Sequence, residues 1–182
     1  MMSDRIHLLF SFISRRYIMK RILSAALVLT LLCSCLLCGC SLFQASPKTF
    51  TKSGMSITLT DDFTERDYVS YTAVYDSQYV AIFAIKEEFS LFDGTALGEN
   101  STTEDYANVV IEGYELDAEP EEIDGMTTFR YDAESNGDTY TYLAVIYKSD
   151  DAFWMIQFAT KADNFEEQED NILTYAKSVA FE

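Results

Sequence analysis

The sequence predicts one α+β domain, in which a mostly antiparallel β-sheet is covered by two amphipathic helices, preceded by a signal peptide. Within residues 49–182, short runs rich in Tyr, Val, Ile and Phe alternate with turn residues, which is typical of antiparallel strands. Two segments, one after Ser101 and one after Asp163, carry apolar residues at helical spacing. A basic pair, Lys20-Arg21, precedes an apolar run that ends in a cluster of cysteines.

Residues 1–39 form the predicted signal region. Lys20-Arg21 and the run from Ile22 to Leu37 match the basic and apolar parts of a secretory signal. This run of about 16 residues is shorter than the ~20 that a membrane-spanning helix needs. We expect translation to begin at Met19. Residues 14–20 also resemble a twin-arginine export motif, so that route stays open beside general secretion.

The end of the apolar run resembles the lipobox of bacterial lipoproteins. Its residues are Leu37, Cys38, Gly39 and Cys40. The resemblance implies that the Cys40 thiol receives a diacylglyceryl group and that the chain is cut before Cys40. A second candidate lipobox ends at Cys35, and an uncleaved membrane anchor is the third alternative. We expect a protein held by its lipid on the extracytoplasmic face of the cell membrane, with residues 40–48 as the tether.

Charge and composition exclude several classes of function. The chain carries 30 Asp+Glu against 13 Lys+Arg, a net charge of −17, and five of those bases precede Cys40. Such an acidic body argues against a nucleic-acid partner, because phosphate binding needs Lys and Arg. All four cysteines lie within residues 33–40, and the one histidine is His7. A chain cut before Cys40 therefore has no intramolecular disulfide, Cys/His zinc site or His-based catalytic triad, and we expect no cofactor.

The first half of the domain predicts two strand pairs and a helix. Ser53-Gly54 is a hairpin turn between Phe50–Lys52 and Met55–Thr60, and a second pair follows at Asp67–Tyr75 and Tyr79–Lys86. Ser101 and Glu104 have the spacing of a capping box. The helix that they open ends before Pro120, and its predicted apolar face consists of Tyr106, Val109, Val110 and Tyr114.

The second half predicts a meander and a last helix. The predicted strands are Glu122–Ile123, Met126–Glu134, Thr139–Tyr147 and Ala152–Thr160, with turns at Asp124-Gly125 and Asn136-Gly137. Asp163 and Glu166 form the predicted cap of the helix. Its apolar stripe consists of Phe165, Ile172, Ala176 and Val179.

This order of elements resembles the PsbP-like group. The segments that carry the resemblance are Gly54–Ile57, Gly125 with Phe129–Tyr131, and Phe153–Phe158. It implies an α-β-α sandwich and, by analogy of fold, a binding or accessory module rather than an enzyme. The metal-linked role of the photosynthetic member is not implied, because no ligand residues match.

Paired tyrosines are the candidate recognition residues. Tyr71 and Tyr75 lie on one face of a predicted strand, as do Tyr140 and Tyr142. Such a strip would stack on sugar rings or contact a protein, although tyrosine also packs well within sheets. We therefore expect a non-enzymatic module that binds an envelope protein or a small ligand.

Two other functions stay open. Residues 132–137 match the first half of a calcium loop, but Leu143 stands where a bidentate Glu is needed. Acidic clusters around Asp61, Glu121 and Glu166 would hold a divalent cation weakly if two of them met. Paired carboxylates also serve glycoside hydrolysis, which makes a small hydrolase the less favoured alternative.

Overall fold

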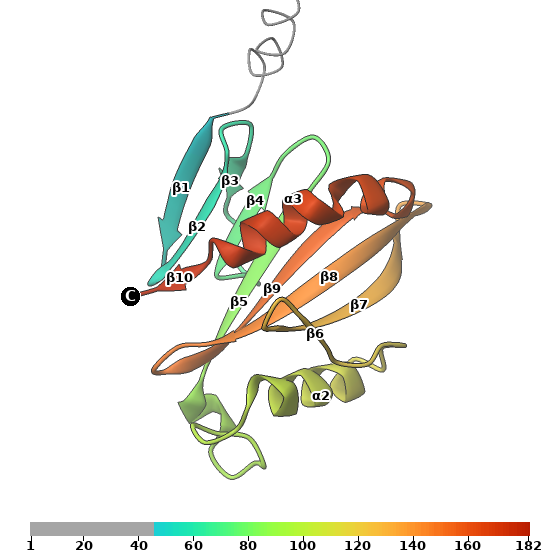
Figure 1. The fold of residues 1–182 in the computed structure, drawn as a ribbon. Helices are drawn as coiled ribbons and strands as arrows, with labels where there is room; N and C mark the ends of the chain where they lie inside the picture. The colour runs from blue at the N-terminus through green and yellow to red at the C-terminus, as the bar shows by residue number, and fades with distance from the viewer. Residues whose placement is uncertain (1–45) are drawn as a thin grey trace, which may run out of the picture. The chain divides into compact units, whose positions relative to one another are not determined.

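The computed structural model describes residues 46–182, which form two antiparallel sheets with two α-helices (Figure 1). The predicted signal region, the lipobox and most of the predicted tether lie outside these residues. Neither α-helix of the described part has both the length and the apolar character needed to cross a membrane.

A small sheet joins the two ends of the domain. It has the order β1-β2-β10 and consists of β1 (Pro47–Lys52), β2 (Met55–Thr60) and β10 (Ala180–Phe181). Ser53 and Gly54 close the β1–β2 hairpin with φ values of 56° and 87°, as a primed two-residue turn requires. Met55, Ile57 and Leu59 of β2 are buried, because their alternate positions share one face of the strand.

The large sheet has seven antiparallel strands in the order β3-β4-β5-β9-β8-β7-β6. Its long central strands, β5, β9 and β8, come from both halves of the chain. In chain order the seven strands are β3 (Thr64–Arg66), β4 (Ala73–Asp76), β5 (Ala81–Glu88), β6 (Glu121–Ile123), β7 (Met126–Ser135), β8 (Asp138–Lys148) and β9 (Ala152–Lys161).

Both faces of the large sheet are covered, so the core has two parts. The helices α2 (Thr103–Gly113) and α3 (Phe165–Lys177) lie on opposite faces (Figure 1). Successive side chains of β8 point to opposite faces and so show this division. Leu143 belongs to the cluster that contains α3, and Ala144 belongs to the cluster that contains α2. The predicted α+β class and antiparallel sheet are confirmed. The cover is not two helices alone, however, since residues of the small sheet also pack in the α3 cluster.

Two predicted elements of the first half differ in the structure. Only the end of the predicted strand Asp67–Tyr75 is regular, as β4, which pairs with β5 as predicted and also with the unpredicted β3. The capping box of α2 is one residue later than predicted, with Thr102 as the N-cap and Asp105 as its partner. Val109, placed on the apolar face by the sequence, is exposed, and Ala107 is buried in its place.

The last helix also begins differently. A 3-10 turn, η3 (Ala162–Asn164), contains Asp163, and α3 starts at Phe165 with Asn164 as an N-cap that makes no side-chain capping bond. Phe165, Ile172 and Ala176 are buried as predicted.

Candidate functional site

A groove on the α2 face of the large sheet is the strongest candidate site. Its cavity has a volume of about 340 Å³. We call it the aromatic groove. Its lining contains no charged residue and consists of Tyr71, Ile85, Val110, Tyr114, Leu116, Tyr131, Ala133, Tyr142, Met155 and Gln157.

The register of the β7–β8 hairpin builds the floor of the groove. Tyr131 lies directly opposite Tyr142, and their rings stack with centroids 4.9 Å apart at an interplanar angle of 7°. Gln157 of the next strand, β9, donates a hydrogen bond from Nε2 to the Tyr131 hydroxyl at 2.7 Å. This bond leaves the Tyr131 proton free to be donated to a bound molecule.

Two further tyrosines form the walls. Tyr71 lies in the loop before β4, and its ring packs on Phe83 of β5 with centroids 5.0 Å apart. Tyr114 is the C-cap of α2, and 69% of its surface is exposed. The groove therefore has a wall from a loop on one side and a wall from a helix end on the other.

Tyr131 and Tyr142, on the floor of the groove, are neutral at physiological pH. Burial raises the pKa of Tyr131 to about 12, and the neighbouring phenols of Tyr142 and Tyr71 add to that rise. Burial also raises the pKa of Tyr142. The groove thus offers aromatic faces, phenol hydroxyls and one amide, which is a set of groups suited to an uncharged ligand.

A smaller cavity of about 170 Å³ continues the groove beneath α2. It shares four lining residues with the aromatic groove, namely Ile85, Val110, Tyr114 and Met155, and adds Glu87, Phe92, Tyr106 and Val109. The Tyr106 hydroxyl donates a hydrogen bond to the Glu87 carboxylate, and burial raises the pKa of Tyr106. This pair satisfies both polar groups and anchors α2 to β5.

The four tyrosines predicted for recognition have different locations. Tyr71 and Tyr142 line the groove, and Tyr140 lies half-buried on the same face of β8 as Tyr142. The prediction is wrong for Tyr75, which is 0% exposed in the opposite core, with its ring 4.9 Å from that of Phe50. The predicted site residues Leu37, Cys38, Gly39 and Cys40 lie outside the described part of the chain.

Sequence reasoning missed Tyr131, Tyr114 and Gln157. Tyr131 could have been found, because a two-residue turn at Asn136-Gly137 places it opposite Tyr142. Tyr114 was assigned to the buried face of the helix, and no local signal marks Gln157.

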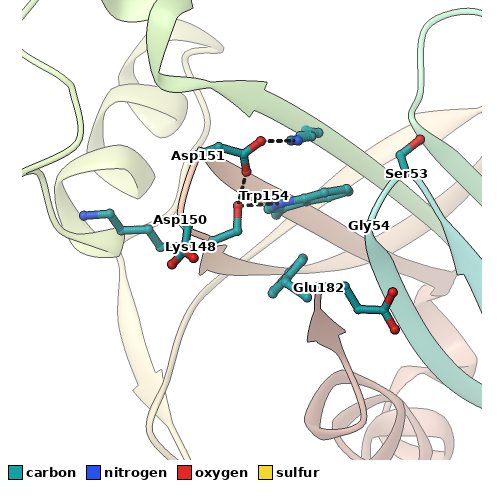
Figure 2. A pocket seen from close by; sticks show the side chains of 10 residues that line it. Ser53, Gly54, Lys148, Asp150, Asp151, Trp154 and Glu182 are labelled. Carbon is teal, nitrogen blue, oxygen red and sulfur yellow. Dashed lines mark hydrogen bonds and ion pairs between the residues drawn. The ribbon is translucent and has the colours of Figure 1, made fainter.

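Another cavity, of about 370 Å³, lies at the β8–β9 turn beside Trp154 (Figure 2). Four of its lining residues, Lys86, Ser149, Asp151 and Trp154, bind one another through their side chains. The Lys86 ammonium lies 2.6 Å from the Asp151 carboxylate, and Ser149 donates to Asp151 and accepts from the Trp154 indole. Lys148 reaches away from Trp154 (Figure 2) and donates to the carbonyl of Ser101 at 2.9 Å. We interpret these contacts as the structural support of the turn.

The carboxylates of residues 46–182 do not gather into a cation site. No group of three or more His, Cys, Asp or Glu side chains in this part of the chain is placed to hold a metal ion. The segment that resembles a calcium loop is a tight hairpin turn, with φ values of 54° at Asn136 and 86° at Gly137. Asp132 accepts a hydrogen bond from the Thr141 hydroxyl at 2.6 Å instead.

No family model matches the chain, and no curated protein matches it. The solved structures to which it is similar include cyanobacterial PsbP (CyanoP) from Synechocystis, at 13% identity and a TM-score of 0.49 over 79% of this chain and 96% of that one.

A second similar structure is a protein from Bacteroides thetaiotaomicron, at 12% identity and a TM-score of 0.47 over 77% of this chain. The match spans 49% of that longer protein. A third is LpqN, involved in cell envelope biogenesis of Mycobacterium tuberculosis, at 15% identity and a TM-score of 0.42 over 75% of this chain and 90% of that one. A PsbP is therefore among the solved structures that this chain is similar to in fold, as the sequence resemblance predicted.

Proposed function

We propose that this protein is a lipid-anchored, non-enzymatic binding module on the extracytoplasmic face of the cell membrane, and that the aromatic groove receives its ligand. One observation carries the proposal. Four tyrosines line a groove without a charged side chain, although the chain as a whole has a net charge of −17.

The composition of the groove favours binding. Tyrosine provides a large contact area at low cost in side-chain entropy, and its hydroxyl adds directional hydrogen bonds. The cavity volume of about 340 Å³ falls within the range of about 300–1,000 Å³ that is usual for ligand sites. The ligand class that fits is uncharged and carries hydrogen-bonding groups, either as a small molecule or as a surface of an envelope protein.

The anchor is supported by the lipobox-like segment that ends at Cys40. A diacylated cysteine holds a protein at a membrane without help from its surface. An acidic domain gains no attraction from anionic lipid headgroups. The groove would therefore stay available to a partner beside the membrane.

Site-specific photocrosslinking in cells tests the proposal. A photoreactive phenylalanine analogue replaces Tyr114 in the wall of the groove or, as the matched control, Tyr79, which is 53% exposed and does not line the groove. We expect the analogue at Tyr114 to capture a recurrent neighbour that the analogue at Tyr79 does not capture, and the Tyr131→Ala variant to lose it. Equal capture at both positions, or capture that survives Tyr131→Ala, would contradict the groove as the binding site.

A further inference from the structure

The outer edge of β7 is open along most of its length. β6 pairs only with residues 126–128 of β7, whereas β7 continues to Ser135. Within residues 46–182, no strand pairs with the outer edge of residues 129–135. We call this stretch the β7 edge.

The hairpin turns show which backbone groups face outward. Asn136-Gly137 is a two-residue turn, so Ser135 exchanges hydrogen bonds with Asp138 and directs its backbone polar groups toward β8. Because this direction alternates along a strand, the N–H and C=O groups of Arg130, Asp132 and Glu134 point to the open side. The turn at Asp124-Gly125 leads to the same assignment. It directs the backbone groups of Met126 toward β6, which lies on the same outer side of β7.

The space beside this edge is hollow. A cavity of about 390 Å³ lies between Glu115, Leu116 and Asp117 on one side and Arg130, Tyr131 and Asp132 on the other. The side chains of the β7 edge beyond Tyr131 are exposed. An added strand would therefore find both free backbone groups and room for side chains.

We propose that the β7 edge binds an extended, basic peptide segment of a partner protein as an additional strand. Unpaired strand edges accept such segments through backbone hydrogen bonds. The side chains around the edge favour a positively charged partner, because four of them are acidic: Glu115, Asp117, Asp132 and Glu134. The nearby cation, Arg130, directs its guanidinium over the Phe165 ring at 5.4 Å from the centroid.

The same charges oppose pairing with a second copy of this chain. Two β7 edges would bring Asp132 and Glu134 against their counterparts, and like charges opposite each other destabilise a strand pair. β1 also has an open side within the described residues, but it begins with Pro47 and carries Lys48 and Lys52. Pro lacks an N–H to donate, and lysines discourage added strands.

This inference rests on the backbone of the β7 edge and not on the aromatic groove, with which the cavity beside the edge shares Leu116 and Tyr131, and it is tested separately. The full chain, purified in mild detergent, is titrated with the peptide acetyl-(Lys-Val)3-amide, and hydrogen exchange of residues 126–138 is followed by mass spectrometry. The control peptide has the same sequence and charge, with an N-methyl group on every backbone nitrogen of its Lys and Val residues, so that neither of its edges can donate to a strand. Glu134→Pro removes one outward N–H without removing a bond to β8, and Glu134→Gln removes the same charge but keeps the N–H.

We expect the first peptide to slow exchange in the β7 segment and the N-methylated peptide to leave it unchanged. Glu134→Pro should weaken binding roughly fivefold more than Glu134→Gln, which corresponds to about one backbone hydrogen bond. Failure of the first peptide to slow exchange, or equal binding of the two peptides, would overturn the proposal. Equal affinity of the two Glu134 variants would also overturn it, because the attraction would then be one of charge alone.

Discussion

Two buried tyrosines provide a matched test of how hydroxyl groups affect stability in this core. Tyr147 donates a hydrogen bond to the Ala176 carbonyl at 2.8 Å, near the end of α3. The Tyr75 hydroxyl is buried and has no hydrogen-bond partner among residues 46–182. Replacing either residue with Phe removes one oxygen atom from a buried ring, but only the substitution of Tyr147 should lower the free energy of unfolding.

The magnitudes follow from these contacts. A buried hydroxyl without a partner costs about 1–3 kcal/mol, so Tyr75→Phe should leave the free energy of unfolding unchanged or raise it. Tyr147→Phe loses one hydrogen bond and should lower it by about 1 kcal/mol. The loss should not be larger, because the Val179 N–H also donates to the Ala176 carbonyl, at 3.1 Å.

Urea unfolding followed by the fluorescence of Trp154, the one tryptophan of the chain, measures both values. If Tyr75→Phe destabilises the protein as much as Tyr147→Phe, the Tyr75 hydroxyl has a partner in solution and the reasoning is wrong. Tyr75→Phe should also leave ligand capture unchanged, because Tyr75 lies in the core on the face opposite the aromatic groove.

Three further measurements test the helix cap, the groove and the anchor. Thr102→Ala should lower the free energy of unfolding by about 1 kcal/mol, because the Thr102 hydroxyl accepts from the Asp105 N–H at 3.0 Å; Thr102→Ser should recover most of it in the same urea assay. The pKa of Tyr131 is raised to about 12, against about 10 in an unfolded chain. The contribution of protonated Tyr131 to the free energy of unfolding should therefore be complete below pH 10 and be lost as the pH rises toward 12. Urea midpoints between pH 8 and 12 should decline less steeply in Tyr131→Phe, and an unchanged slope would contradict this assignment. Cys40→Ser should leave a folded protein that fractionates away from membranes, and a variant that stays in the membrane fraction would contradict the anchor.

Local signals predicted the turns and most of the strands. Ser53-Gly54, Asp124-Gly125 and Asn136-Gly137 all adopt positive φ values, as two-residue hairpins require. These motifs succeed because the conformation depends on the few residues of the turn itself. The cap of α2 was placed one residue too early, since Ser101 and Thr102 are both favoured N-cap residues and Ser ranks above Thr by type.

The pairing of distant segments could not be predicted in the same way. β10 completes the small sheet by pairing Ala180 with Ser56 and Phe181 with Met55. No local pattern in either segment specifies this partner. The sequence therefore indicated an N-terminal hairpin, but not that the hairpin would form a separate sheet with the end of the chain.

The aromatic groove shows the same division. The sequence alone determined that Tyr140 and Tyr142 share a face of one strand, because side chains alternate along a strand. It could not determine which face is solvent-accessible, because both faces of this sheet are covered and apolar residues occupy both. Only the tertiary structure decided that Tyr75 is buried, while Tyr71, Tyr114, Tyr131 and Tyr142 line one groove. The reason is that this groove lies where a loop, a helix end and four strands (β5, β7, β8 and β9) meet. That arrangement depends on contacts between parts of the chain far apart in sequence.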